Sequence, residues 1–186
     1  NPLSVAIGAG AAFVARSVDV FQAHLKETLH RAAKHKGTAF VEILQNCNIF
    51  NDKAWSHVTE KEAKEESVLY LERGKPMLFG KAKDKGIRLN GLTPEVVHLG
   101  DGVTADDCLV FDDSRDDPAM AFILAQMMPP HFPTPIGVLR AVEQPSYEER
   151  VVGQIQHEIA TRGEGSLDAL LRAGDVWTVH EDGTIA

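Results

Sequence analysis

The run from Thr38 to Leu44, which ends in a polar loop, constrains the fold more than any other feature of this sequence. Its β-branched, aromatic and aliphatic residues predict a buried strand, and the asparagines that follow predict a loop. Cys47 lies just where the strand stops, between Asn46 and Asn48. Because ligands of α/β proteins bind at the carboxyl ends of strands, we expect Cys47 to meet a ligand rather than to fill a core.

The residues before this run complete a strand–helix–strand unit. Phe13 to Arg16 predict a short strand, and Asp19 is expected to cap a helix over about residues 20–35, which Gly37 ends. A crossover this short requires two parallel strands. Residues 1–50 therefore predict an α/β fold, at the end of a doubly wound parallel sheet.

Residues 51–186 follow a different pattern, which predicts a mixed α+β extension. The crowded charges of residues 51–67 favour a solvated helix or a mobile loop. A helix is expected to start at Asp117 and Pro118, and two more are expected over residues 147–161 and after Ser166. Short strands are expected at residues 68–71, 76–79, 86–89, 96–99 and 109–111.

Bulk composition narrows the classes of partner and compartment. A formal net charge of −8 makes nucleic acid a poor partner, and no window approaches the roughly 20 apolar residues of a membrane span. Two cysteines are too few for a disulfide scaffold, which favours a reduced, cytoplasmic compartment. The chain begins Asn1-Pro2 and turns apolar at once, so we expect it to start within a domain.

The two cysteines have different settings. Free cysteine is most often a small buried hydrophobe, and this alternative stays open for Cys47. One cysteine cannot hold a metal or cluster alone, so a site at Cys47 needs ligands from elsewhere. Cys108 begins an apolar run and is expected in the core.

Several apparent motifs fail their required context. Gly100-Asp101-Gly102 lacks the downstream asparagine of a magnesium–diphosphate site, so we expect a turn there. A glycine-rich stretch at residues 7–13 precedes a strand instead of following one, which favours close helix packing over dinucleotide binding. The aspartates of residues 106–117 lack calcium-loop spacing. No H-E-x-x-H, G-x-S-x-G or P-loop is present, so the chain has no complete catalytic constellation.

Three segments carry a family resemblance, with further support near residues 132–140 and 167–171. They are Asn1-Pro2-Leu3-Ser4-Val5-Ala6, Gly10-Ala11-Ala12-Phe13-Val14-Ala15-Arg16 and Gly37 to Asp52, the last containing Gln45-Asn46-Cys47-Asn48-Ile49-Phe50. The chain resembles the C-terminal half of the β subunit of 2-oxoacid:ferredoxin oxidoreductases, of the 2-oxoglutarate type (2-oxoglutarate synthase).

The resemblance implies a reaction and its cofactors. These enzymes use thiamine diphosphate with Mg²⁺ for the CoA-dependent oxidative decarboxylation of a 2-oxoacid, here 2-oxoglutarate to succinyl-CoA. Electrons pass through a [4Fe–4S] cluster to ferredoxin, and the β subunit works with an α subunit. By position, Cys47 corresponds to the fourth cluster ligand, and Asn46 and Asn48 are expected to offer amides near the cluster sulfurs.

The resemblance also implies a division of the chain and leaves alternatives open. Residues 1–50 would be the last βαβ part of the thiamine-diphosphate-binding domain, and residues 51–186 a C-terminal extension that contacts another subunit. The family's other three cluster cysteines and its diphosphate motif are absent, and are expected upstream of Asn1. A pyruvate or branched-chain 2-oxoacid oxidoreductase, a non-catalytic partner-binding module and a generic α/β domain with core cysteines remain the alternatives.

Overall fold

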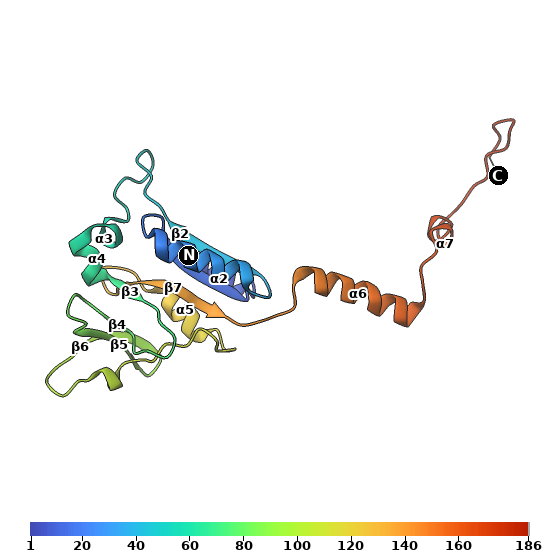
Figure 1. The fold of residues 1–186 in the computed structure, drawn as a ribbon. Coiled ribbons are helices and arrows are strands. Elements are labelled where there is room, and N and C mark those ends of the chain that lie inside the picture. Colours follow the sequence, from blue (N-terminus) through green and yellow to red (C-terminus); the bar gives the residue numbers. More distant parts are fainter. Residues whose placement is uncertain (186) are drawn as a thin grey trace. The chain divides into compact units, whose positions relative to one another are not determined.

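The computed structural model describes residues 1–185 and divides the chain into two compact units, Asn1–Pro145 and Ser146–Ala186. In the first unit, helices lie against a central sheet and a smaller sheet (Figure 1). The second unit consists of two helices and a short terminal hairpin-like segment. No helix within residues 1–185 is long and apolar enough to cross a membrane.

The central sheet has four strands in the order β2-β1-β7-β3. They are β1 (Phe13–Val18), β2 (Ala39–Leu44), β3 (Val68–Tyr70) and β7 (Thr134–Ala141). β1 pairs in parallel with β2 through the crossover helix α2 (Gln22–Lys34), which confirms the predicted strand–helix–strand unit. β7 runs antiparallel to β1, so the sheet is mixed rather than purely parallel. The α/β class is confirmed, whereas a doubly wound, thiamine-binding sheet and the division at residue 50 stay predictions.

The start of α2 differs from the prediction. Its first helical residue is Gln22, and Phe21 occupies the N-cap without a side-chain hydrogen bond. The Asp19 carboxylate instead accepts a hydrogen bond from the Val20 N–H at 2.7 Å, so its predicted role as the cap is wrong. Gly37 lies beyond the helix, in the left-handed region at φ +121°, where a Cβ would come within 2.8 Å of Ala12.

β2 is an edge strand, which corrects the expectation of a fully buried strand. Of its residues only Leu44 is buried, and Ile43 is exposed. The apolar run resembles a two-sided buried strand, but β2 has β1 as its one neighbour in the sheet. The strand prediction is therefore right in position and wrong in burial.

The main core lies between the sheets and the helices α1 (Pro2–Gly8) and α5 (Ala119–Gln126). Leu3 and Ile7 of α1 pack with Leu124 of α5 and with Val14 of β1. The Asp117 carboxylate accepts a hydrogen bond from the Ala119 N–H at 2.9 Å, as predicted for the start of this helix. A Cβ added at Gly8 would meet only Phe122 at 4.0 Å and one added at Gly10 would meet nothing within 4 Å, so close helix packing does not require these two glycines, which corrects the expectation.

The remaining part of the first unit is a small antiparallel sheet with short helices. The elements are α3 (Ser56–Thr59), α4 (Lys61–Ser67), β4 (Leu78–Phe79), β5 (Lys85–Asn90), β6 (Thr93–His98) and a 3-10 helix at Ala105–Asp107. The predicted strand over residues 109–111 is reduced to one isolated bridge, Pro76 to Val110. Gly100 and Val103 exchange backbone hydrogen bonds at 2.9 Å, which confirms the turn at Gly100–Gly102.

The second unit contains α6 (Tyr147–Arg162) and α7 (Leu167–Leu171), close to the predicted bounds. Ser146 caps α6 through a reciprocal capping box with Glu149. The Ser166 hydroxyl accepts from the Ala169 N–H at 3.2 Å and caps α7, as predicted. Figure 1 draws α6 as one unbroken helix.

Candidate functional site

The loop that follows β2, residues 45–53, holds the candidate ligand and is named the Cys47 loop. It leaves the carboxyl end of β2 and turns back on itself. The Asn51 N–H donates to the Cys47 carbonyl at 2.9 Å, and the two residues form an isolated bridge. Cys47 is partly exposed, which removes the alternative of a core cysteine at this position.

The Asn46 side chain joins the two ends of the Cys47 loop. Its oxygen accepts from the Lys53 N–H at 2.8 Å, and its nitrogen donates to Asn48 Oδ1 at 2.6 Å and to Asp52 Oδ1 at 3.0 Å. Lys53 holds a positive φ of 62°. The Asn46 amide thus makes its hydrogen bonds inside the loop and shapes the turn around Cys47. Its expected approach to cluster sulfurs stays a prediction.

Backbone groups set the electrostatics of the Cys47 thiol. Hydrogen bonds from the N–H groups of Phe50 and Ile49, and more weakly of Asn51, lower its pKa, against a smaller opposing effect of burial. Donors aimed at sulfur favour the thiolate, which is the form that binds metals. These donors were not identified from the sequence, because a backbone N–H has no residue signature; the run of turn-forming asparagines was the available signal.

The tip of the Cys47 loop is apolar and fully presented to the surface. Ile49 is 84% exposed and Phe50 is 89% exposed. Large apolar residues at such exposure mark surfaces that another chain or domain covers. A thiol with a lowered pKa beside an apolar tip suits one ligand of a site that other groups complete.

Within residues 1–185, no group of three or more His, Cys, Asp or Glu side chains is placed to hold a metal ion. Cys47 therefore contributes at most one ligand. Four of the aspartates at residues 106–117 accept local hydrogen bonds instead. Asp107 accepts from the Thr104 hydroxyl and Asp112 from the Ser114 hydroxyl. Asp113 accepts from Arg31 and Arg73, and Asp117 accepts from the Ala119 N–H at the start of α5. The absence of a calcium loop among these aspartates stays a prediction.

Cys108 is a core residue, as predicted. It is buried, and burial raises the pKa of its thiol. Its sulfur fills the space above Gly86, where an added Cβ would come within 2.3 Å of it. Cys108 is thus packed in the core, whereas Cys47 is partly exposed in its loop.

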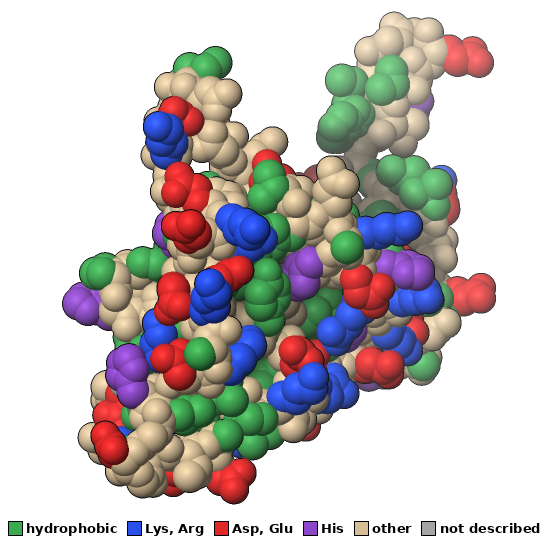
Figure 2. All heavy atoms as spheres, turned by 60° about the vertical axis from the view of Figure 1, so that its left-hand side comes forward, with side chains coloured by type: hydrophobic (Ala, Val, Ile, Leu, Met, Phe, Trp, Pro, Cys, Tyr) green, Lys and Arg blue, Asp and Glu red, His purple; other side chains and the backbone are tan. Residues whose placement is uncertain are grey.

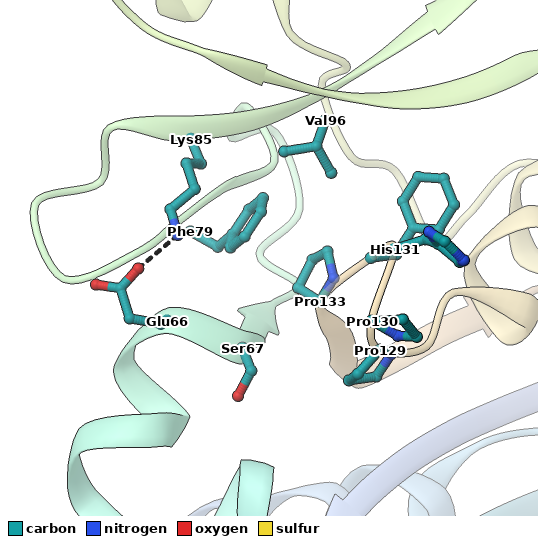
Figure 3. Close-up of a pocket in the computed structure, with 10 residues that line it drawn as sticks. Glu66, Ser67, Phe79, Lys85, Val96, Pro129, Pro130, His131 and Pro133 are labelled. Carbon is teal, nitrogen blue, oxygen red and sulfur yellow. Dashed lines mark hydrogen bonds and ion pairs between the residues drawn. The ribbon is translucent and has the colours of Figure 1, made fainter.

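A separate hollow of about 230 Å³ lies between α4, the small sheet and the proline-rich segment before β7 (Figure 3). Phe79, Val96 and Pro133 face it, and Glu66 pairs with Lys85 at its rim. This volume is below the roughly 300 Å³ of the smallest usual ligand sites, and its two charges neutralise each other. The hollow therefore offers no reactive group comparable to Cys47.

Acidic and basic side chains are interleaved over the face drawn in Figure 2, with apolar patches between them. Such a surface lacks a large field of one sign. It gives no electrostatic footprint for nucleic acid.

Comparison with known proteins shows which proteins this sequence is similar to. No family model matches the chain. The 2-oxoglutarate oxidoreductase subunit KorB of Mycobacterium tuberculosis is 37% identical over 182 residues, which is 96% of this chain and 48% of that protein. The subunit beta of 2-oxoacid:ferredoxin oxidoreductase 1 of Aeropyrum pernix is 46% identical over 52 residues, 28% of this chain and 16% of its own length. The corresponding subunit of Saccharolobus solfataricus is 46% identical over 52 residues, 28% of this chain and 17% of its own length.

The chain spans about half the length of the M. tuberculosis relative and a smaller share of the archaeal ones. Each of these relatives is a subunit of an oxidoreductase that acts on 2-oxoacids. The resemblance seen in the sequence is confirmed: the chain is similar over nearly all of its own length to the M. tuberculosis subunit, and over 28% of it to the two archaeal β subunits.

Proposed function

We propose that the chain is the β-subunit portion of a 2-oxoglutarate:ferredoxin oxidoreductase. The reaction is 2-oxoglutarate plus CoA plus two oxidised ferredoxins giving succinyl-CoA, CO₂, a proton and two reduced ferredoxins. The observation that carries the proposal is the 37% identity to a 2-oxoglutarate oxidoreductase subunit over 182 residues. The geometry of the Cys47 loop supports it, because the loop presents a partly exposed thiol at the end of a strand, and neighbouring backbone N–H groups lower the pKa of that thiol.

Cys47 would hold one iron of a [4Fe–4S] cluster, which when bound carries single electrons. The backbone N–H groups of Ile49 and Phe50 favour the thiolate that ligation requires. Hydrogen bonds to a ligating sulfur also raise the reduction potential of a cluster. Asn46 holds the turn that brings those donors to the sulfur.

Thiamine diphosphate and Mg²⁺ have no matching residue set among residues 1–185. Gly100-Asp101-Gly102 forms a surface turn, and the region around it contains no partner asparagine. We propose that residues outside this sequence hold it, together with the other three cluster cysteines.

The proposal includes an α-type partner subunit, ferredoxin as the electron acceptor and a cytoplasmic location. The relatives' status as subunits supports the first, and the cysteine usage of the chain supports the last. The archaeal relatives are named for 2-oxoacids in general, which favours a second candidate that accepts pyruvate or branched-chain 2-oxoacids. Initial rates on a panel of 2-oxoacids with a viologen acceptor separate the two.

The cluster assignment is tested by Cys47→Ala in the complete β subunit assembled with its α partner. We expect loss of the cluster, or a shift in its reduction, seen as lower iron content and an altered electron paramagnetic resonance signal after dithionite reduction. Cys108→Ala is the matched control and should keep iron and signal, because that thiol is buried away from the loop. An unchanged signal in Cys47→Ala would remove the ligand assignment, and iron-free protein that still binds α would favour the non-catalytic module.

A further inference from the structure

The helix α6 is specified by its own residues. Ser146 and Glu149 form a capping box at its start, Glu158 and Arg162 pair at 3.0 Å one turn apart, and Gly163 ends it at φ +80°. Such local signals favour one helical conformation. A helix of this length is nevertheless marginal alone in water, so its persistence depends on packing an apolar face.

The apolar face of α6 is uncovered in the structure. Val152, Ile155 and Ile159 follow the i, i+3, i+7 spacing of one helix face and are 49%, 55% and 44% exposed. In α7, Leu167, Leu170 and Leu171 share one face at i, i+3, i+4 spacing and are 71–72% exposed. Across residues 146–185, none is buried. Two successive amphipathic segments thus present large aliphatic side chains to a partner.

The charge of this segment restricts the kind of partner. Residues 146–186 contain eight acidic residues and three arginines, a net −5, out of −8 for the whole chain. Two such segments would repel each other. α6 has 16 residues, which is fewer than the roughly three to four heptads of a coiled-coil seam. Both observations argue against a second copy of this segment and in favour of a basic partner.

We infer that residues 146–171 dock as an amphipathic helical segment into an apolar groove with a Lys- and Arg-rich rim on the α-type subunit. The inference rests on the proposed function, since the relatives are subunits of oxidoreductases and a partner chain is thereby implied. Helix-in-groove binding uses anchors at this spacing. The acidic residues fix the register of the helix in the groove and speed its association, and the aliphatic side chains provide the affinity.

The test measures binding of the purified α subunit to the complete, cluster-loaded β subunit. Ile155→Asp should weaken the complex by at least about tenfold, because it places a charge at the centre of the buried face. Gln156→Asp adds the same charge one position along the same helix and should change affinity by less than about twofold. The affinity of the wild type should also fall with added salt. Circular dichroism checks that both variants keep the helix.

Wild-type affinity in Ile155→Asp would overturn the inference. So would an oligomer of β alone that Ile155→Asp dissociates, since that result assigns the face to a second copy. The cluster signal of both variants is recorded in the same experiment. An intact signal in a variant that no longer binds α supports docking. A wild-type protein that lacks the cluster but still binds α contradicts the proposed function and leaves the docking inference standing.

Discussion

The side-chain oxygen of Asn46 accepts a hydrogen bond from the Lys53 N–H at 2.8 Å and thereby closes the loop that carries Cys47. The same amide group also donates to Asn48 and Asp52. One side chain therefore fixes the turn in which the backbone of Ile49 and Phe50 faces the sulfur.

Asn46→Ala should release this turn without removing the ligand. In the assembled enzyme we expect iron content near that of the wild type and a more negative cluster reduction potential, because fewer backbone donors stay aligned with the sulfur. A redox titration followed by electron paramagnetic resonance measures it. Gln45→Ala, an exposed neighbour outside these hydrogen bonds, is the control and should leave the potential unchanged; an equal shift in both would refute the role of Asn46.

Gly86→Ala should destabilise the first unit through a clash with Cys108. The added Cβ would lie 2.3 Å from the Cys108 sulfur and 3.0 Å from Leu78 Cδ2, and overpacking of this kind costs about 1–3 kcal/mol. Chemical denaturation measures the loss. The double variant Gly86→Ala/Cys108→Ala should recover much of it, because the sulfur is gone. Gly153→Ala, whose Cβ meets nothing, should not destabilise the protein.

Asp113→Asn should lower the free energy of unfolding by about 1.5–3 kcal/mol, the range for hydrogen bonds to charged groups. The Asp113 side chain is 2% exposed and accepts from Arg31 at 2.8 Å and from Arg73. The substitution weakens the connection of the segment before α5 to α2, through Arg31, and to the turn after β3, through Arg73. Asp112→Asn changes the half-exposed neighbour and should cost under about 1 kcal/mol. Equal losses in the two variants would contradict the assignment.

Stability should fall between pH 7.5 and pH 5.5, in part because of His24. Its Nδ1 lies 2.8 Å from the Ser17 hydroxyl, and burial lowers its pKa below the ordinary value of 6.5. The unfolded chain therefore binds the proton first as pH falls, so unfolding becomes easier below about 6.5. Burial lowers the pKa of His57 as well and adds to the effect.

His24→Gln keeps a polar group beside Ser17 and removes the titration. Urea unfolding at the two pH values should show a smaller difference for this variant than for the wild type. His30→Gln, on the exposed face of the same helix, should retain the wild-type difference. If His24→Gln leaves the pH dependence intact, another group is responsible.

Much of the fold was predictable because its signals are local. The strand–helix–strand unit of β1, α2 and β2, the turn at Gly100, and the cap at Ser166 all follow from nearby residues. The antiparallel position of β7 was not predictable, because its partner strand β1 lies more than a hundred residues earlier in the sequence. For the same reason β2 was taken for a buried strand: burial depends on neighbours that a local pattern does not specify.

The candidate site was predictable in position and not in mechanism. Cys47 could be singled out by where the strand ends, but the hydrogen bonds of Asn46 within the loop could not, because they depend on how the loop folds back. The donors to sulfur belong to the backbone of Ile49 and Phe50, whose side chains gave no such signal.

The most direct test of the account is the reduction of a viologen acceptor by the complete β subunit assembled with its α partner. The account predicts reduction that requires both 2-oxoglutarate and CoA and that Cys47→Ala abolishes or strongly slows. Formation of a stable complex that reduces no acceptor with any 2-oxoacid would contradict it.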